Sequence, residues 1–358
     1  MNPIERLSER LIAGDSKKAA LIYSTINRYY LTSFPSSAGI LLVTAEKAYY
    51  LLDFRYAEAA RAKAKGAEVV DLVSLDETLK NLLNKHGITS VYMEYATLPY
   101  GTAKRLEKIC NDCGAEALLT TELDEAIRVQ RIIKSEDEIQ RICDAQAITD
   151  ATFTHILNFI REGVTEREIA LEIESHMRKL GADGNAFDPI VVTGTNGSQC
   201  HGVPGNTPIR KGDLITMDTG ARLNGYNSDM TRTVAVGYVN DEQRDIYNTV
   251  LKAQVSAIEA IHAGVRCCDI DKVARDIIET PYPGTFGHSL GHGVGFEIHE
   301  WPGFSTRDET IAEPGMVITV EPGIYVAGKC GVRIEDMIVV TEDGCRNLTH
   351  SPKELIIL

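Results

Sequence analysis

The sequence lacks the features that mark membrane-spanning, nucleic-acid-binding and secreted proteins. Its longest apolar runs, such as residues 39–43, are far shorter than the ~20 apolar residues that a membrane-spanning helix requires. The chain does not open on a basic stretch followed by an apolar segment, so we expect no secretory signal. Its 37 basic and 51 acidic residues give a formal net charge of −14, whereas phosphate binding needs clustered Lys and Arg. We therefore expect a cytoplasmic globular protein that binds neither nucleic acid nor membranes.

The cysteines show no pattern of a disulfide framework or a zinc site. Eight cysteines in a chain of 358 residues do not resemble the dense spacing of small secreted domains. Cys110 and Cys113 form a Cys-x-x-Cys pair, but no second pair and no nearby histidine pair completes a zinc site. We expect these thiols to be free.

Residues 1–125 alternate short β-branched runs with helical stretches. Residues 39–44 and 48–53 flank a short turn and predict a β-hairpin. The stretch 55–65 is rich in Ala, Arg and Lys and stops at Gly66, which predicts a helix that ends at a glycine. Together these patterns predict a small α/β domain with mixed strands.

After residue 125 the pattern changes to longer helices followed by strands. Ser135 and Thr165 each begin a capping box and are followed by apolar residues at helical spacing. The predicted helices cover 135–160, 165–180, 241–263 and 269–279, and the strand-rich stretches cover 190–239 and 316–340. The order helix, helix, strands occurs twice, which indicates a duplicated unit.

A predicted hairpin places two aspartates on one face of a sheet. The dipeptide Asn224-Gly225 joins two strand-like runs, which is a strong signal for a two-residue turn. A turn centred there pairs Asp218 with Thr231 and sets Asp218 and Asp229 diagonally on the same face. Two carboxylates on one apolar face repel each other unless a proton or a cation lies between them.

Two later segments carry further acidic and imidazole groups. Glu321 and Glu335 lie at the ends of, or inside, apolar strands, where glutamate is rare unless it is paired or bound to a metal. The stretch 287–295 holds His288 and His292 among four glycines, which argues against a helical His pair of the zincin type.

The candidates add up to two aspartates, two glutamates and one histidine. This oxygen-rich set suits Mn²⁺ or a similar divalent ion better than structural zinc. Four carboxylates carry the negative charge that two divalent cations neutralise. Two metal ions about 3.5–4 Å apart activate water and stabilise an oxyanion. The residues alone therefore predict a two-metal hydrolase and leave its substrate open.

These motifs resemble the signatures of the pita-bread metallopeptidases, the superfamily of aminopeptidase P, prolidase, methionine aminopeptidase and creatinase. The stretches that carry the resemblance are 27–34, 51–56, 218–233, 288–302, 319–325 and 331–336. The resemblance implies an α+β protein with a creatinase-like N-terminal α/β domain over 1–125 and a pita-bread catalytic domain over 126–358.

The resemblance also implies roles for the metal ligands. Asp229 and Glu335 would bridge two metal ions, Asp218 would complete one site, and His292 with Glu321 would complete the other. Glu321 would in addition carry a proton to the leaving nitrogen. The implied cofactors are two divalent ions, with Mn²⁺ preferred and Co²⁺, Zn²⁺ or Fe²⁺ as alternatives.

Five further residues acquire roles through the same resemblance. His201 matches a histidine that contacts the substrate, and His288 and His299 match accessory catalytic histidines. We also expect His299 and Tyr325 to contact the substrate, and Arg333 to hold the region of the bridging Glu335. Relatives are frequently homodimers, so we expect a homodimer.

The resemblance leaves several activities to be separated. Methionine aminopeptidases lack the N-terminal domain, and creatinase does not keep the five ligands. Prolidases of this length commonly carry arginine directly after the His-Glu-x-Pro stretch, where this chain has Gly303 and, further on, Arg307. A missing guanidinium removes a charge-assisted contact to a dipeptide's carboxylate. This favours a Xaa-Pro aminopeptidase that acts on small peptides with proline second. A Xaa-Pro dipeptidase is the alternative, followed by a catalytically silent peptide-binding protein.

Overall fold

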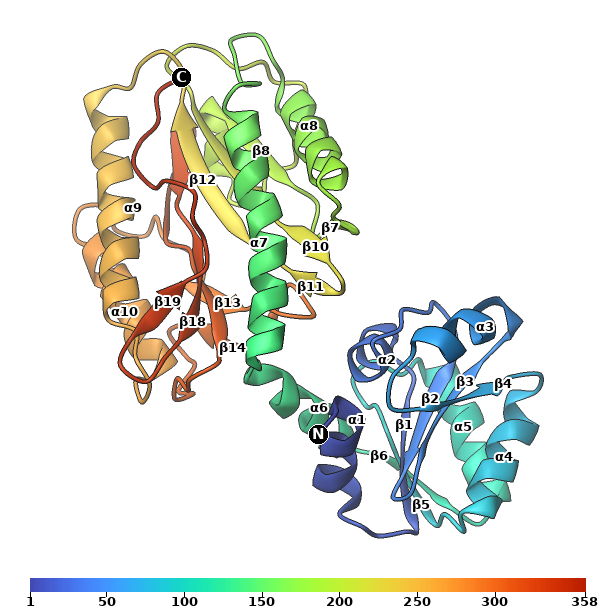
Figure 1. Ribbon diagram of the computed structural model, residues 1–358. Coiled ribbons are helices and arrows are strands. Elements are labelled where there is room, and N and C mark those ends of the chain that lie inside the picture. The colour runs from blue at the N-terminus through green and yellow to red at the C-terminus, as the bar shows by residue number, and fades with distance from the viewer. The chain divides into compact units, whose positions relative to one another are not determined.

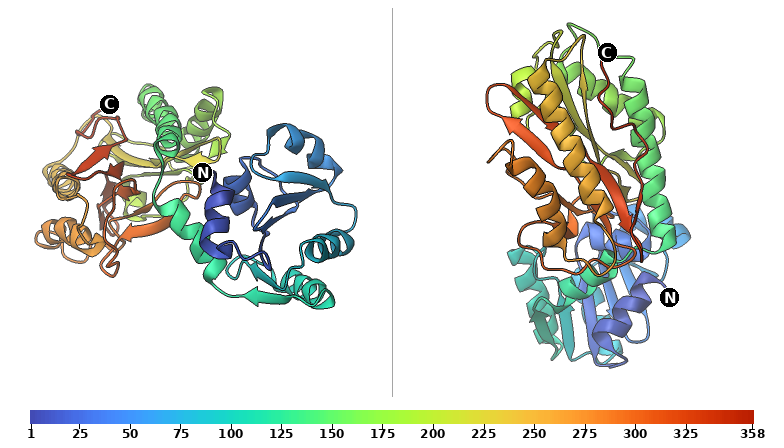
Figure 2. Two further views of the ribbon diagram at one scale, coloured as in Figure 1. Left: turned by 60° about the horizontal axis from the view of Figure 1, so that its bottom comes forward. Right: turned by 90° about the vertical axis from the view of Figure 1, so that its left-hand side faces the viewer.

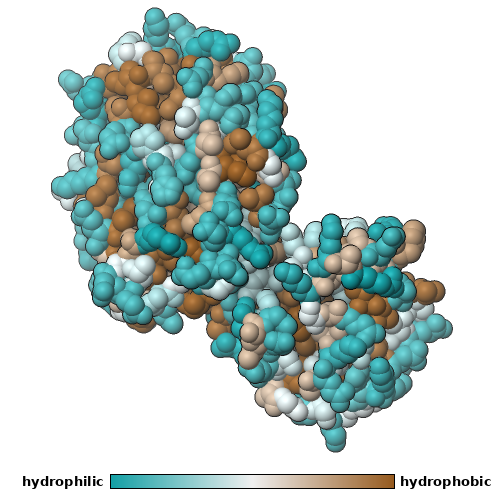
Figure 3. Space-filling view, in the orientation of Figure 1, coloured by the Kyte–Doolittle hydropathy of each residue, from teal (hydrophilic) through white to brown (hydrophobic).

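The computed structural model describes all 358 residues, which divide into two compact units, Met1–Arg131 and Ile132–Leu358 (Figure 1). The boundary predicted at 125/126 lies within helix α6 (Glu122–Ile132) and stays a prediction. No helix combines the length and the apolar character needed to cross a membrane. On the face seen in Figure 3, hydrophilic side chains predominate on the surface of each unit, and smaller apolar patches are scattered among them.

The first unit is built on a six-stranded sheet with the order β4-β3-β2-β1-β5-β6. Its strands are β1 (Lys18–Ile22), β2 (Ile40–Thr44), β3 (Ala48–Leu52), β4 (Glu68–Asp71), β5 (Ser90–Met93) and β6 (Glu116–Leu119). Its helices before α6 are α1 (Pro3–Leu7), η1 (Ser8–Ile12), α2 (Thr25–Thr32), α3 (Phe54–Lys63), α4 (Leu75–Lys85) and α5 (Tyr100–Asp112). The antiparallel pair β2–β3 confirms the predicted hairpin. Helix α3 confirms the predicted helix, but it ends at Lys63 with Ala64 as its C-cap, so the predicted end at a glycine is wrong. Helices α4 and α5 bury their apolar sides against the sheet.

The second unit places strands between two pairs of helices. The helices are α7 (Glu136–Ile156), α8 (Glu166–Lys179), α9 (Asp241–Glu259) and α10 (Cys267–Glu279). Both predicted capping boxes are present, with Ser135 and Thr165 as the N-cap residues. Helices α7 and α8 contribute to one apolar core, and α9 and α10 contribute to another. Figures 1 and 2 show α7 and α9 on opposite sides of the strands, as expected for two similar halves.

The strands of the second unit form four small sheets. Their bounds are β7 (Gly184–Asn185), β8 (Ile190–Thr193), β9 (Leu214–Thr219), β10 (Ala221–Leu223), β11 (Tyr226–Asn227), β12 (Met230–Ala235), β13 (Gly291–Gly293), β14 (Glu300–Phe304), β15 (Val317–Val320), β16 (Gly323–Val326), β17 (Cys330–Arg333), β18 (Asp336–Val340) and β19 (Cys345–Asn347). The sheet orders are β12-β9-β8, β14-β13-β15-β18-β19, β16-β17 and β11-β10-β7. A short 3-10 helix, η2 (Gly194–Ser198), follows β8.

The hairpin that carries the two aspartates has the predicted register. Strands β9 and β12 are antiparallel, with Asp218 opposite Thr231. Asn224 and Gly225 adopt positive φ angles of 51° and 85°, the conformation that a two-residue hairpin turn of this kind needs. The turn chemistry therefore fixes the register, and the register sets which side chains face the interior.

Candidate metal centre

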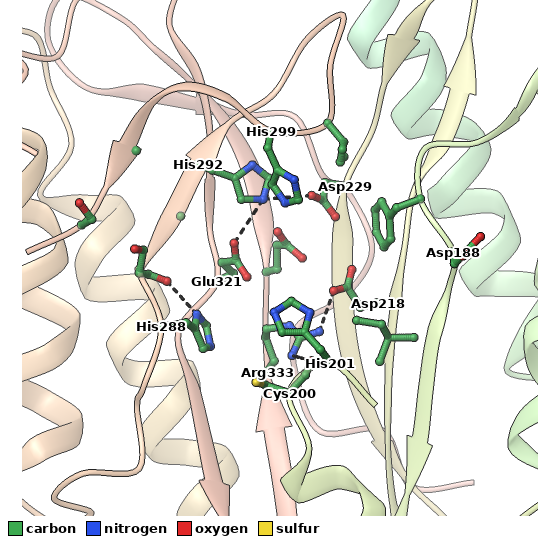
Figure 4. A pocket seen from close by; sticks show the side chains of 18 of the residues that line it. Asp188, Cys200, His201, Asp218, Asp229, His288, His292, His299, Glu321 and Arg333 are labelled. Carbon is green, nitrogen blue, oxygen red and sulfur yellow. Dashed lines mark hydrogen bonds and ion pairs between the residues drawn. The ribbon is translucent and has the colours of Figure 1, made fainter. Parts of the chain in front are cut away.

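Four carboxylates and one imidazole converge in one cavity of the second unit. Figure 4 labels three of the carboxylates, Asp218, Asp229 and Glu321, and the imidazole of His292. Asp218 lies in β9, His292 lies in β13, and Asp229, Glu321 and Glu335 lie at strand ends. The Nε2 atom of His292 lies 3.5 Å from an oxygen of Asp229 and 3.5 Å from an oxygen of Glu321. Asp229, His292 and Glu335 each offer a ligand atom, and these atoms all lie within 4.8 Å of one another. This spacing suits a shared cation.

The carboxylates are crowded and buried, which makes their joint ionisation unfavourable. Asp229 and Glu335 are 3% and 1% exposed. Burial first, and then the charge of Glu335 and its neighbours, raises the pKa of Asp229 well above its usual range. Burial and the charges of Glu321 and Asp218 do the same to the pKa of Glu335. Burial also raises the pKa of Glu321 to about 8.

Two buried oxygen atoms at the centre have no hydrogen-bond partner. They are the Oδ1 atoms of Asp218 and Asp229. Buried polar atoms are nearly always paired, so orphaned carboxylate oxygens in such a cluster require a missing partner. A divalent cation bound by oxygen ligands meets this requirement and relieves the repulsion as well. The donor set therefore fits the divalent ions that the sequence predicts.

The imidazole of His292 is in the form that a metal ligand needs. Its Nδ1 atom donates a hydrogen bond to the carbonyl of Gly293 at 3.1 Å, so Nε2 carries the lone pair and faces the carboxylates. Burial, with a smaller effect from His299, lowers the pKa of His292 to about 4. The ring is therefore neutral at physiological pH.

Neighbouring side chains hold the carboxylates in place. The hydroxyl of Thr231 donates to Glu335 at 2.7 Å and accepts a hydrogen bond from Nε of Arg333 at 3.0 Å. Another nitrogen of Arg333 lies 2.6 Å from Asp218 Oδ2. The hydroxyl of Thr319 donates to a carboxylate oxygen of Glu321 at 3.2 Å. Such contacts orient ligands and are a regular part of metal sites.

His288 and Tyr325 form a connected pair beside the centre. Nδ1 of His288 donates to the carbonyl of Ser289 at 2.8 Å, so Nε2 accepts from the hydroxyl of Tyr325 at 3.0 Å. The same hydroxyl accepts a hydrogen bond from Arg333 at 2.8 Å. Burial, and then the charge of Arg333, lowers the pKa of His288 to about 4. This histidine is therefore neutral, and both of its ring nitrogens are occupied.

A cavity of about 800 Å³ opens over the centre. Besides the five converging side chains, its wall includes His201, His288, His299, Trp301 and Arg307. Arg307 is exposed and makes no hydrogen bond or ion pair with the protein, so its guanidinium is available to a ligand. The cavity is large enough for a small peptide.

Comparison with known families shows which family of proteins contains this chain. The model of metallopeptidase family M24 matches residues 140–342, and that of the creatinase/prolidase N-terminal domain matches residues 4–133. The chain belongs to metallopeptidase family M24. This membership confirms that the protein is a peptidase whose family works with divalent metal ions, and it confirms the predicted α+β fold with a creatinase-type N-terminal domain and a pita-bread domain.

The M24 peptidase is similar to several proteins over nearly its whole length. It is 41% identical to a Xaa-Pro dipeptidase of Pyrococcus horikoshii over 96% of this chain and 95% of that protein. Among solved structures, a Xaa-Pro dipeptidase from Bacillus anthracis is 42% identical with a TM-score of 0.93, covering 99% of both chains. An X-Pro aminopeptidase from Thermotoga maritima is 35% identical with a TM-score of 0.91, covering 98% of this chain and 99% of that one.

The M24 peptidase brings together the five side chains that the sequence predicts as ligands, although their role as ligands stays a prediction. His201, His288 and His299 line the cavity. The ring of His299 packs edge-on against His292 with ring centroids 4.3 Å apart. Tyr325 does not line the cavity, since its hydroxyl lies between Arg333 and His288.

Sequence reasoning missed two threonines of this M24 centre. Thr231 lies two residues after Asp229, and Thr319 lies two residues before Glu321. Residues two apart in a strand point to the same face, so strand alternation was the signal that could have found both.

Sequence reasoning also missed an ion pair that supports His288 in the M24 peptidase. Asp271 and Arg275 of α10 pair at 2.7 Å, and Arg275 donates to the carbonyls of Phe286 and His288. The spacing of Asp271 and Arg275 on a helix predicts their pairing but not the segment that they hold.

Proposed function

We propose that this protein is a Xaa-Pro dipeptidase that cleaves dipeptides with proline in the second position. The observation that carries the proposal is the unpaired guanidinium of Arg307 on the cavity wall. A dipeptide differs from a longer peptide in the free carboxylate on its proline, and arginine binds carboxylates with charge-assisted hydrogen bonds. Arg307 thus supplies the cation that prolidases commonly have at the position of Gly303. The dipeptidases among the relatives support this choice over the aminopeptidase that the sequence alone favoured.

We propose two divalent ions as cofactors, Mn²⁺ first and Co²⁺, Zn²⁺ or Fe²⁺ as alternatives. Asp229 and Glu335 would lie between them, Asp218 would hold one ion, and His292 with Glu321 would hold the other. When bound, such ions supply a nucleophile from water at neutral pH and polarise the scissile carbonyl.

The remaining chemistry belongs to the side chains of the cavity. Glu321 would take up a proton and deliver it to the nitrogen of the leaving proline, a step suited to a carboxyl that burial has made more basic. His201 and His299 would contact the substrate from the cavity wall. We assign His288 as an accessory histidine, and Arg333 and Tyr325 as positioning residues, because their polar atoms are occupied by one another and by Asp218.

Peptide length is the test of this function. The purified protein, loaded with Mn²⁺, should hydrolyse Xaa-Pro dipeptides and leave Xaa-Pro-Yaa tripeptides nearly untouched. Preferential cleavage of tripeptides would favour the aminopeptidase. Absence of turnover with every substrate and metal would favour a silent binding protein. The homodimer and the cytoplasmic location stay predictions, testable by light scattering and by cell fractionation.

Replacement of Arg307 by alanine should raise KM for a Xaa-Pro dipeptide roughly 10- to 100-fold, because the substrate's carboxylate loses a charged partner worth about 1.5–3 kcal/mol. The value of kcat should change much less. Arg210→Ala is the matched control, since Arg210 is an exposed arginine of the same unit outside the cavity. Steady-state kinetics on both variants check the prediction, and an unchanged KM in Arg307→Ala would remove the basis of the dipeptidase proposal.

A further inference from the structure

A loop of the second unit carries His201 to the cavity. We call residues 194–205 the pocket segment; it begins with η2 and ends at Gly205. Within it, residues 200–204 line the cavity. His201 has no hydrogen bond or ion pair of its own, so its position depends on how the backbone of the pocket segment is held.

A single buried carboxylate joins the two ends of the pocket segment. Glu166, the first residue of α8, is 1% exposed. One of its oxygens accepts hydrogen bonds from the backbone of Thr193 at 2.8 Å and from the side chain of Asn196 at 2.9 Å. Its other oxygen accepts from the backbone of Gly205 at 3.0 Å. Glu166 therefore contacts the residue before the segment, a residue near its start, and its last residue.

The opposite side of the pocket segment lies against the strand that carries Arg333. A β-carbon built on Gly331 of β17 would lie 1.9 Å from the carbonyl oxygen of Gly197, so the two backbones are in direct contact. Arg333 donates to the carbonyl of Cys200 at 3.3 Å. The segment is thus held between β17, which leads to the metal centre, and the carboxylate of Glu166.

We propose that Glu166 is a positioning residue for substrate binding, which acts by fixing the pocket segment and through it His201. Its carboxylate makes no ion pair, and all three of its partners are amide groups that belong to or adjoin the segment. The start of a helix stabilises a negative side chain, which lets the carboxylate stay in place without a cation. The effect on turnover rests on the proposed function, since it requires that His201 contacts the substrate.

The test is Glu166→Gln, which keeps the size of the side chain. Glutamine has one acceptor oxygen, so its NH₂ group must face either the amide of Gly205 or the donors of Thr193 and Asn196, and one end of the segment is released. We expect kcat/KM on a Xaa-Pro dipeptide to fall roughly 10- to 100-fold, as small misplacements of binding groups do. Bound metal should be unchanged, because Glu166 touches no ligand.

A double-mutant cycle separates positioning from general damage. His201→Ala removes the side chain that the segment places, so adding Glu166→Gln to it should cost little more. Glu168→Gln is the matched control: it lies in the same helical turn, is exposed, and contacts only the N-cap Thr165. Asn196→Ala removes one of the three bonds and should show a smaller loss in the same direction, which keeps the test valid if Glu166→Gln folds poorly.

Hydrogen exchange gives a readout that needs no substrate. Amides of residues 194–205 should exchange faster in Glu166→Gln than in the wild type, and those of Glu168→Gln should not. If the wild type hydrolyses no Xaa-Pro peptide, the proposed function is wrong. The exchange rates still test whether Glu166 fixes the pocket segment. The proposal is overturned if the amides of residues 194–205 exchange in Glu166→Gln at the wild-type rate. It is also overturned if Glu166→Gln lowers kcat/KM by the same factor in the wild type and in His201→Ala.

Discussion

Replacement of Glu321 by glutamine is expected to lower kcat on Xaa-Pro dipeptides by roughly 10²–10⁴-fold, the usual contribution of a general acid–base group. The carboxyl is buried, has a pKa raised to about 8, and accepts from Thr319 at 3.2 Å, so it is both held in place and able to exchange a proton. Glutamine keeps the shape and an acceptor oxygen but cannot carry the proton. Steady-state kinetics with Mn²⁺ present measure the effect.

Metal content decides how a loss of activity in Glu321→Gln is to be interpreted. Mass spectrometry of the purified variant shows whether metal is still bound, since Glu321 is also a proposed ligand. The matched control is Glu313→Gln, at an exposed glutamate of the same unit, and it should keep wild-type kinetics. Near-normal kcat in the Glu321 variant would show that another group moves the proton.

Divalent cations are expected to raise the melting temperature of the metal-free protein by roughly 5–10 °C. At an ion concentration 100 times Kd, binding to the folded state alone contributes about 2.7 kcal/mol. Each kcal/mol shifts Tm by about 2–4 °C in a domain of about 150–250 residues, the size range of the unit Ile132–Leu358 that holds the centre. The physical reason is the removal of repulsion among the buried carboxylates. Calorimetry with and without Mn²⁺, after treatment with a chelator, gives the measurement.

The gain in melting temperature from metal should grow as pH rises above about 5, beyond the range in which the unfolded carboxyls titrate. Burial and neighbouring charges raise the pKa values of Asp229 and Glu335 in the folded chain, whereas these carboxyls titrate near 4 when unfolded. At pH values between the unfolded-state pKa and the raised folded-state pKa of these carboxyls, the folded state holds more protons than the unfolded state. The stability of the metal-free protein therefore falls as pH rises. The cation replaces those protons and restores the stability.

Asp229→Asn separates repulsion from metal binding. The metal-free variant should melt at a higher temperature than the metal-free wild type, because one of the crowded charges is gone, and Mn²⁺ should add much less stability to it. Asp188→Asn is the control: Asp188 is exposed and lines the same cavity, but its carboxylate points away from the centre (Figure 4). A metal-free Asp229→Asn protein less stable than the wild type would contradict the account of repulsion.

Local chemistry explains which parts of the fold could be predicted from the sequence. The capping boxes at Ser135 and Thr165 and the turn at Asn224-Gly225 depend on residues close together in the chain, and all three are present. The register of the hairpin follows from its turn, so the pairing of Asp218 could be predicted to the residue. The meeting of this hairpin with Glu321 and Glu335 depends on packing between separate sheets, so it followed from the combined chemistry of the residues and from the family resemblance and not from any local pattern.

Arg307 shows most clearly what the sequence could not supply. Its position after Gly303 was visible, but its access to the cavity depends on the conformation of the intervening loop. That loop is held by buried Asp308, whose two carboxylate oxygens accept hydrogen bonds from the backbones of Gly303 and Thr310, each at 2.9 Å. Side-chain-to-backbone bonds of this kind compete with other local conformations. The predicted preference for an aminopeptidase rested on the absence of arginine at Gly303 and took no account of the loop conformation that brings Arg307 to the cavity.

The direct contact between Gly197 and Gly331 has a consequence for changing the substrate range of the enzyme. Where these two backbones touch, neither glycine can be replaced by a residue with a side chain, and the loop cannot move without moving the strand. The backbone that supports residues 200–204 of the cavity wall is therefore unsuitable for redesign. The wall around Trp301 and Arg307 is formed by exposed side chains, so their replacement changes the contacts to a ligand without disturbing a contact between backbones. Variants selected for bulkier or differently charged peptides should therefore accumulate their substitutions on that second wall.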